Sequence, residues 1–309
     1  MARKLELTTE ELKDIKELAN DLITYSREVN ALEYAFRCKN SFNRFPLRIQ
    51  RKIFEMKSRG YPYIVISNLL TDPDIPVTPL KKTSLSQAPE YYQTLLLIFS
   101  MALGYFYKFK SKNHEGFVED IFPIQEHADK QLGTNSAFLE WHVEDIVHSA
   151  KPDYVGLFCL RGNEHAKTLL FEGRDYYSST TYNNRLSDAK FKVYADETFN
   201  KKFQKSSMIS VFEECDDPEF NYDPFFMITE DNGDREALNR LQNFIDRNYL
   251  EIVLQPGEIL LFDNRRVAHS RTNYTPKFDG SDRWLLRSVI VESTWKLRYS
   301  KTEQELTVQ

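Results

Sequence analysis

The pattern of apolar residues changes near residue 138, and this change constrains the fold more than any other feature of the chain. Before it, apolar residues recur at helical spacing, as between Leu12 and Ile23. After it, short runs of β-forming residues are separated by turn signals such as Gln255-Pro256-Gly257 and Asp279-Gly280. This order favours an α+β fold, in which an N-terminal helical layer packs on a mostly antiparallel jelly-roll core.

Individual elements can be placed along this pattern. Thr8 and Glu11 have the spacing of a capping box, which predicts the start of a helix. The three prolines of residues 72–79 indicate a loop. Further helices are expected over residues 49–56, 90–107 and 234–248. Strands are expected over residues 63–66, 139–143, 154–160, 251–254, 259–262 and 284–291.

The length of 309 residues suits one elaborated domain or two modest ones. We expect a single domain over residues 1–309, in which residues 1–110 form the helical layer and residues 120–295 form the jelly-roll core. An insertion into that core is expected at about residues 175–250.

Composition argues against several partners. Lys and Arg number 41 against 46 Asp and Glu, and no basic block occurs, so a nucleic-acid partner is not expected. The most apolar stretch, residues 91–107, is short for a membrane span and contains polar residues. No signal peptide is visible, and three cysteines without CxxC spacing suit a reducing compartment, so we expect a cytoplasmic protein. The sequence leaves homo-oligomerisation open.

His142 and Glu144 suggest a metal site. On a strand, residues i and i+2 point to the same face, and a histidine with a carboxylate there suits a cation better than a dry core. His269, which follows a β run and a turn, is the candidate third ligand. Two histidines and one carboxylate form the facial triad of non-haem Fe(II) oxygenases. The alternative is a surface carboxylate beside a core histidine, since His-x-Glu alone is common.

Arg283 favours the metal site over that alternative. It lies fourteen residues after His269, in the β-like run that continues to Arg287. A guanidinium group offers a fork of donors that matches a carboxylate, and beside an iron site it would anchor the far end of a dicarboxylate cosubstrate. An ion pair with a surface acid is the ordinary alternative, but both signals occur together in this chain.

At these residues the sequence resembles the clavaminate synthase-like Fe(II)/2-oxoglutarate dioxygenases, specifically the bacterial hydroxylases of free amino acids. The matching stretches are QLGTNS (131–136), LEWHVEDIVH (139–148), KPDYVGLFCLRG (151–162) and the segment 258–287. The last stretch is the most specific, with NRR, the distal histidine, a DG turn and DRWL. Val143, Ile146 and Val147 depart from the common pattern, which leaves details of the pocket open.

The resemblance implies a double-stranded β-helix, a cupin-like jelly roll, with flanking helices. It also implies that Fe(II) is held by His142, Glu144 and His269, with O2 and 2-oxoglutarate as cosubstrates. Arg283 would then bind the distal carboxylate of 2-oxoglutarate, and Thr168 would assist it.

For the substrate, the resemblance implies that Arg287 binds the α-carboxylate of a free amino acid. Gln131 and Asn135 would contact the backbone atoms of that amino acid. The implied reaction hydroxylates an unactivated C–H bond of the side chain and releases succinate and CO2.

We expect L-lysine, hydroxylated at C4, by overall likeness to lysine 4-hydroxylases. A buried ammonium needs an acidic partner, and residues 213–223 form an acidic segment. Asp223, followed by Pro-Phe-Phe, is the best candidate to face the substrate, with Asp216 or Asp217 behind it. L-arginine, L-ornithine and hydroxylation of lysine at C3 remain alternatives.

The alternative of another class is a non-catalytic jelly roll that binds a metal or a small molecule, but it would have no need of Arg283 and Arg287. A zinc hydrolase is weaker, because no separate general base is placed near the triad. His114 and His127 lie in polar segments, so we expect both to be solvated.

Overall fold

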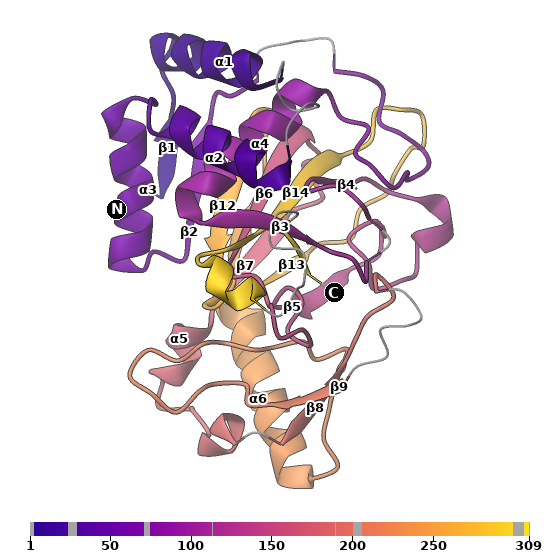
Figure 1. Cartoon of the computed structure of the whole chain (residues 1–309). Helices are drawn as coiled ribbons and strands as arrows, with labels where there is room; N and C mark the ends of the chain where they lie inside the picture. The colour runs from indigo at the N-terminus through magenta and orange to yellow at the C-terminus, as the bar shows by residue number, and fades with distance from the viewer. Residues whose placement is uncertain are drawn as a thin grey trace.

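Two β-sheets face each other at the centre of the molecule, and helices cover the outer side of the larger sheet (Figure 1). The computed structural model describes residues 3–23, 30–70, 75–112, 114–188, 190–199, 206–298 and 306–308. Part of the loop expected over residues 72–79 therefore lies outside the described residues, and residues 75–79 have no regular structure.

The larger sheet has the strand order β1-β2-β12-β6-β14-β3-β15, and β4 also pairs with β14. Neighbouring strands are antiparallel except for β1 with β2 and β15 with β3, as the sequence pattern predicted for most of the core. The strands are β1 (Lys4–Glu6), β2 (Tyr63–Ser67), β3 (Tyr105–Phe109), β4 (Glu119–Ile121), β6 (Tyr154–Arg161), β12 (Ile259–Asp263), β14 (Trp284–Val291) and β15 (Thr307–Val308).

The smaller sheet is fully antiparallel and has the order β11-β7-β13-β5. Its strands are β5 (Leu139–His142), β7 (Thr168–Glu172), β11 (Leu250–Ile252) and β13 (Val267–Arg271). Apolar side chains from both sheets meet between them: Val155, Leu157, Leu260, Phe262 and Leu285 from the larger sheet, and Leu170 and Val267 from the smaller.

Strand alternation decides which polar residues share this interior. Successive side chains of a strand point to opposite faces, so residues of the same parity as Leu285 and Val267 also point between the sheets. His269 and Arg271 have the parity of Val267 on β13, and all three are buried. Arg283 and Arg287 have the parity of Leu285 on or beside β14. The interior therefore combines an apolar core with several nitrogen-bearing side chains.

The helical layer consists of α1 (Thr9–Ile23), α2 (Ala31–Phe42), α3 (Leu47–Arg59) and α4 (Glu90–Leu103). The capping box is confirmed, because the Thr8 backbone N–H donates to Glu11 Oε2 at 2.9 Å and the Glu11 N–H donates to Thr8 Oγ1 at 3.2 Å. α3 ends at Gly60, whose φ of 60° is the left-handed conformation that glycine adopts without strain. α4 packs on β6 and β14 and is buried along most of its length. No helix in the described ranges combines the length and the apolar character of a membrane span.

The helix expected over residues 90–107 is wrong in its last turn. α4 ends at Leu103, and β3 begins at Tyr105. Between them, a Cβ atom at Gly104 would lie 2.1 Å from the Val291 carbonyl oxygen. The chain therefore passes directly against the end of β14 at a position where only glycine fits. The apolar run continues through this break because both the helix and the strand are buried.

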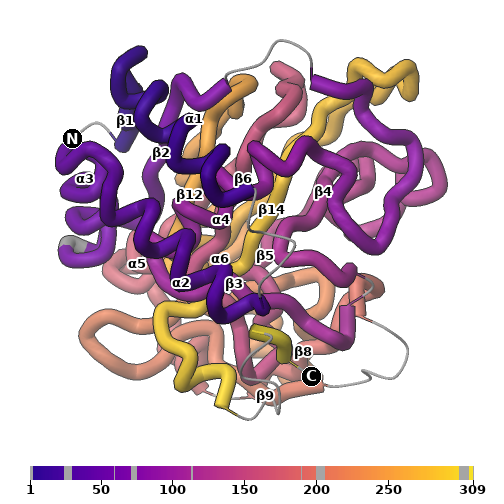
Figure 2. The backbone as a smooth tube through the Cα atoms, turned by 45° about the horizontal axis from the view of Figure 1, so that its top comes forward, coloured from indigo at the N-terminus to yellow at the C-terminus, as the bar shows by residue number. Residues whose placement is uncertain are grey.

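The segment between β7 and β11 contains α5 (Gly173–Tyr177), β8 (Phe191–Tyr194), β9 (Ser206–Ile209), β10 (Met227–Ile228) and α6 (Asn232–Asn248). The three strands form a separate small sheet in the order β10-β8-β9. β8 and β9 lie at the end of the molecule away from α1 (Figure 1 and Figure 2). Phe244 of α6 packs against Phe171 of β7 and Tyr176 of α5, with ring centroids 6.0 and 5.2 Å apart, which attaches this segment to the core.

Candidate metal centre and active-site cavity

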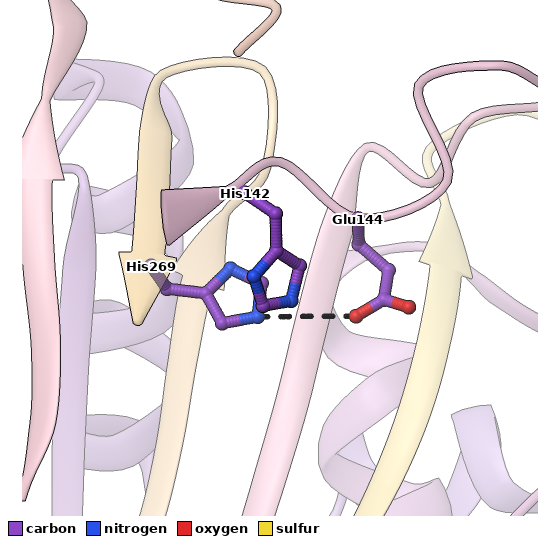
Figure 3. Close-up of side chains that lie close together, drawn as sticks. All are labelled: His142, Glu144 and His269. Carbon is purple, nitrogen blue, oxygen red and sulfur yellow. Dashed lines mark ion pairs between the residues drawn. The ribbon is translucent and has the colours of Figure 1, made fainter. Parts of the chain in front are cut away.

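Three side chains converge at one end of the smaller sheet (Figure 3). His142 ends β5 and is the antiparallel partner of His269 on β13, and their ring centroids are 4.1 Å apart. Glu144 follows two residues later, with its Oε2 atom 3.9 Å from His269 Nε2. One nitrogen or oxygen atom from each residue lies within 4.8 Å of the others. This donor set fits a divalent cation bound on one side, with the remaining coordination positions open.

Glu144 is positioned by Asn264 rather than by strand spacing. β5 ends at His142, so Glu144 lies in the following loop. The Glu144 backbone N–H donates to Asn264 Oδ1 at 2.8 Å, and Asn264 Nδ2 donates to the carbonyl oxygens of Glu144 at 3.1 Å and Pro152 at 2.9 Å. Sequence reasoning noted the NRR run only as part of a resemblance and missed this role of its first residue.

Replacing Asn264 with alanine is expected to lower the free energy of unfolding by about 2–4 kcal/mol, because three buried backbone groups lose their partner. It should also weaken metal binding by about 10- to 100-fold, since Glu144 loses the contact that orients it. Thermal unfolding and metal titration measure the two effects. Asn248→Ala, which removes an exposed contact with the Phe244 carbonyl at the end of α6, is the matched control. Unchanged metal affinity in Asn264→Ala would refute the positioning role.

The three converging side chains are in the protonation states that bind metal. Burial lowers the pKa of His142 and lowers that of His269 well below its usual value, so both rings are neutral at pH 7. Burial raises the pKa of Glu144, but the charges of Arg287 and Lys112 outweigh this effect and hold it at about 2. His142 Nδ1 lies 2.8 Å from the Glu140 carbonyl, an arrangement that leaves Nε2 for a metal.

Arg287 lies against this carboxylate. Its Nη1 atom donates to both carboxylate oxygens of Glu144 at 2.8 Å, and its Nε atom donates to Glu119 Oε2 at 3.1 Å. Lys112 Nζ lies 3.6 Å from Glu144 Oε1 and pairs with Asp145 at 2.7 Å. A buried network of alternating charges therefore joins β14 to the loop that carries Glu144.

Arg283 has a different environment. It is 5% exposed, and its guanidinium group forms no hydrogen bond or ion pair with any residue that the structure describes. Burial lowers its pKa, and the Tyr274 hydroxyl opposes that shift only in part. A buried cation without a partner is costly, so this group is suited to binding an anion that enters from solution. Thr168 is also buried, on β7 opposite Arg271 of β13, with its side chain toward the same interior.

A cavity of about 170 Å³ opens beside the triad, and His142, Glu144 and Arg287 form part of its wall. Carboxylates outnumber Lys and Arg around it. The other acidic residues of the lining are Glu119, Glu140, Asp145, Asp196, Glu197 and Asp223, and the other two basic residues are Lys82 and Lys112. The lining is therefore suited to a small ligand that carries positive charge.

The structure brings only some of the expected substrate residues to this cavity. Gln131 and Asp223 line it. The Gln131 amide is already bonded, accepting from the Glu140 N–H at 2.9 Å and donating to the Phe138 carbonyl at 3.2 Å. Asn135 is fully buried and lies outside the described lining, where its Oδ1 accepts from Arg271. Asp216 is exposed and is also not among the lining residues, because its segment lies on the surface.

Both His114 and His127 line the cavity. The expectation of a solvated side chain is wrong for His114, whose ring nitrogens are buried, whereas His127 is only half-buried. His127 Nδ1 lies 2.7 Å from Thr134 Oγ1. Both ring nitrogens of His114 are buried without a hydrogen-bond partner among the described residues. Nothing in the polar sequence around His114 distinguishes it from a surface histidine, because Arg287, which lines the same pocket, is distant in the chain.

The model of the "Taurine catabolism dioxygenase TauD, TfdA family" matches residues 199–289, a range that contains His269, Arg283 and Arg287. Over this range the chain is similar to this dioxygenase family. The resemblance to the clavaminate synthase-like members is also confirmed, because clavaminate synthase 2 of Streptomyces clavuligerus is 27% identical over 74% of this chain and 73% of its own length.

Other relatives match nearly the whole chain. The enduracididine beta-hydroxylase of Streptomyces hygroscopicus is 26% identical and covers 96% of both chains. The L-lysine 3-hydroxylase of Catenulispora acidiphila is 27% identical and covers 96% of this chain and 86% of its own. The chain is thus similar to proteins that are named as hydroxylases of amino acids.

Solved structures confirm the double-stranded β-helix with flanking helices. Asparagine oxygenase, in complex with Fe(II), 3-hydroxyasparagine and succinate, superposes with a TM-score of 0.91 at 24% identity, over 99% of this chain and 98% of its own. The non-heme iron oxygenase OrfP, in complex with Fe and alpha-ketoglutaric acid, has a TM-score of 0.87 at 25% identity over all of both chains.

Proposed function

We propose that this chain is an Fe(II)/2-oxoglutarate-dependent hydroxylase of a free cationic L-amino acid, with L-lysine as the substrate. The observation that carries the proposal is Asp223, a carboxyl group that lines the cavity beside the triad and has no cationic partner among the described residues. The carbon we propose is C4, from the resemblance to lysine hydroxylases. C3, the position that the name of the Catenulispora relative specifies, is the alternative.

In this proposal His142, Glu144 and His269 hold Fe(II). When bound, the iron supplies O2 activation coupled to conversion of 2-oxoglutarate into succinate and CO2, which provides the oxidant for an unactivated C–H bond. Arg283 binds the distal carboxylate of 2-oxoglutarate with a guanidinium group that no described residue occupies. Thr168, buried on the same interior face, assists it.

Arg287 has a second role in this proposal. Without metal it is paired with both Glu144 and Glu119. Coordination of Glu144 to a cation draws that carboxylate away from the guanidinium and leaves donors free for the α-carboxylate of the substrate. Gln131 keeps the adjacent wall of the cavity in place through its two backbone contacts, and Asn135 supports the same segment from behind.

The far wall of the cavity fits an ammonium or guanidinium group. The Asp223 carboxyl group accepts from the backbone N–H groups of Phe226, at 3.2 Å, and of Phe225, and Asp196 accepts from Thr198. Burial raises the pKa of Asp223 to about 7, a shift that a bound cation would reverse. A neutral or anionic side chain would leave these carboxyl groups unpaired, so the wall discriminates against asparagine.

The size of the cavity favours a free amino acid over a residue in a peptide. Its volume of about 170 Å³ is below the range of roughly 300–1,000 Å³ that is typical for drug-sized ligands. Val193 and Tyr194 of β8 and Gln131 are among the residues that line this cavity.

The test is product analysis with purified protein, Fe(II), 2-oxoglutarate and lysine, ornithine, arginine or asparagine in parallel. We expect one added oxygen on lysine, at C4 by NMR, with one succinate released per product. Preference for asparagine would contradict the cationic pocket. Metal and 2-oxoglutarate binding without any hydroxylation of the four amino acids would favour a binding protein instead.

Replacing Asp223 with asparagine is expected to raise the KM for lysine by roughly 10- to 100-fold, because the ammonium loses its ionised partner. In the unaltered protein the KM should fall roughly tenfold between pH 6 and pH 8, since Asp223, with a pKa of about 7, must ionise to bind a cation. The variant should lose this dependence. Initial rates at varied lysine concentration and pH measure both effects.

Two comparisons make this result specific. Burial raises the pKa of Asp145 to about 7 as well, although Asp145 is paired with Lys112. Loss of the pH dependence of the KM in Asp223→Asn would therefore show that the titrating group is Asp223 and not Asp145. Asp216→Asn changes an exposed carboxylate of the same acidic segment and should leave the KM unchanged. An unaffected Asp223→Asn enzyme would refute the pocket.

A further inference from the structure

A second buried arginine shares the interior with Arg283. Arg271 lies two residues after His269 on β13 and is 3% exposed. It has the same strand parity as His269 and Val267, and Val267 belongs to the core between the sheets. Its neighbour on β7 is Thr168. Arg271 therefore points into the space between the sheets, on the side where the cosubstrate residues lie.

Only one of the three guanidinium nitrogens of Arg271 is used. Nη2 donates to Asn135 Oδ1 and to the Ala137 carbonyl oxygen, the latter at 2.9 Å. Nε and Nη1 are fully buried and have no hydrogen-bond partner among the residues that the structure describes. The group lies over the Tyr274 ring, with Cζ 4.8 Å from the ring centroid. Two of its donors therefore remain available to a ligand.

The positive charges of Arg271 and Arg283 lie close enough in this interior to repel each other. Tyr274 interacts with both groups, and no acidic side chain in the described ranges forms an ion pair with either. Two like charges in a dry interior are costly until an anion lies between them or beside them. A carboxylate is the anion that two forked donors bind best.

We infer that Arg271 binds the distal carboxylate of 2-oxoglutarate together with Arg283, and that it couples cosubstrate binding to the segment of residues 131–137. This inference rests on the proposed function. A carboxylate on Nε and Nη1 fixes the orientation of the guanidinium, and Nη2 then holds Asn135 and Ala137 firmly. Gln131, at the start of the same segment, lines the substrate cavity. Cosubstrate binding thus completes the wall against which the amino acid binds.

The first measurement is the affinity for 2-oxoglutarate, by calorimetry on the Fe(II)-loaded protein without oxygen or amino acid. Arg271→Met is expected to weaken binding at least tenfold, and Arg271→Lys, which keeps the charge, less than Arg271→Met. Arg161→Met is the matched control, because Arg161 already donates to Thr78 Oγ1 at 2.7 Å and to the Pro76 carbonyl at 3.2 Å. It should bind 2-oxoglutarate as the unaltered protein does.

The second measurement is hydrogen–deuterium exchange in residues 131–137 with and without 2-oxoglutarate. The cosubstrate should slow exchange there in the unaltered protein but not in Arg271→Lys, because an ammonium cannot hold a carboxylate and the two oxygens of Asn135 and Ala137 in the same geometry. This readout depends on Arg271→Lys alone, so it stands even where Arg271→Met fails to fold.

Two outcomes would overturn the inference while the proposed function survives: 2-oxoglutarate affinity of Arg271→Met within twofold of the unaltered protein, or equal protection of residues 131–137 in the unaltered protein and Arg271→Lys. If the unaltered protein itself does not bind 2-oxoglutarate, both fail. If it binds 2-oxoglutarate but hydroxylates none of the four amino acids, only the substrate assignment fails.

Discussion

Replacing His269 with alanine is expected to weaken Fe(II) binding by more than about 100-fold and to abolish succinate release. The triad provides one donor atom from each of three residues within 4.8 Å, so removal of an imidazole leaves two ligands for the metal. The fold should persist, because His269 pairs through its backbone with both β5 and β7. Metal titration, succinate release and circular dichroism measure these effects.

His165→Ala is the control for this prediction. The His165 side chain is 76% exposed on the turn between β6 and β7 and is not one of the three converging side chains, so its loss should change neither metal binding nor turnover. Activity of His269→Ala equal to that of the His165→Ala control would show that the metal is bound elsewhere.

The same substitution at Arg287 and Arg283 is expected to have opposite effects on stability. Arg287→Met leaves the buried carboxylates of Glu119 and Glu144 without their shared partner, at a cost of about 3–5 kcal/mol. For a chain of this length that is a decrease in Tm of roughly 5–8 °C. Arg283→Met replaces a buried cation that has no described partner with an apolar chain, and should leave the Tm unchanged or raise it by a few degrees.

For stabilisation by 2-oxoglutarate, the affected variant should be Arg283→Met and not Arg287→Met. 2-Oxoglutarate is expected to raise the Tm of the unaltered protein and of Arg287→Met, but not that of Arg283→Met, because a ligand stabilises only the folded state that binds it. Differential scanning fluorimetry of the three proteins with and without 2-oxoglutarate measures all of these differences. A lower Tm for Arg283→Met without ligand would mean that its guanidinium has a structural partner, and would contradict the anion site.

Local signals in the sequence predicted most of the fold. The strand expected over residues 284–291 matches β14 at both ends, and the capping box of Thr8 starts α1. The errors occur where a distant segment decides the local structure. Gly104 ends α4 because the Val291 carbonyl, distant in sequence, occupies the space beside it. No window of sequence around residue 104 contains that information.

The candidate site likewise contains residues that the sequence predicted and residues that it did not. His142, Glu144, His269 and Arg283 were identified from residue type and spacing, and they converge or lie buried as that pattern requires. Their partners were not identified, because Asn264, Arg271 and His114 acquire their roles from residues far away in the chain. Asp216 and Asp223 belong to one acidic segment; Asp223, the preferred candidate, lines the cavity, whereas Asp216 is exposed.

The position of Asn264 and His269 late in the chain has a consequence for synthesis on the ribosome. Glu144 is oriented by Asn264, and His142 meets its partner ligand only when β13 has paired with β5. β2 and β6 likewise wait for β12 before their sheet can form. Such distant pairings form late, after the slow loop closures that they require. A nascent chain that stops before residue 269 therefore lacks one of the three side chains of the candidate metal centre, so the complete donor set can form only late in synthesis.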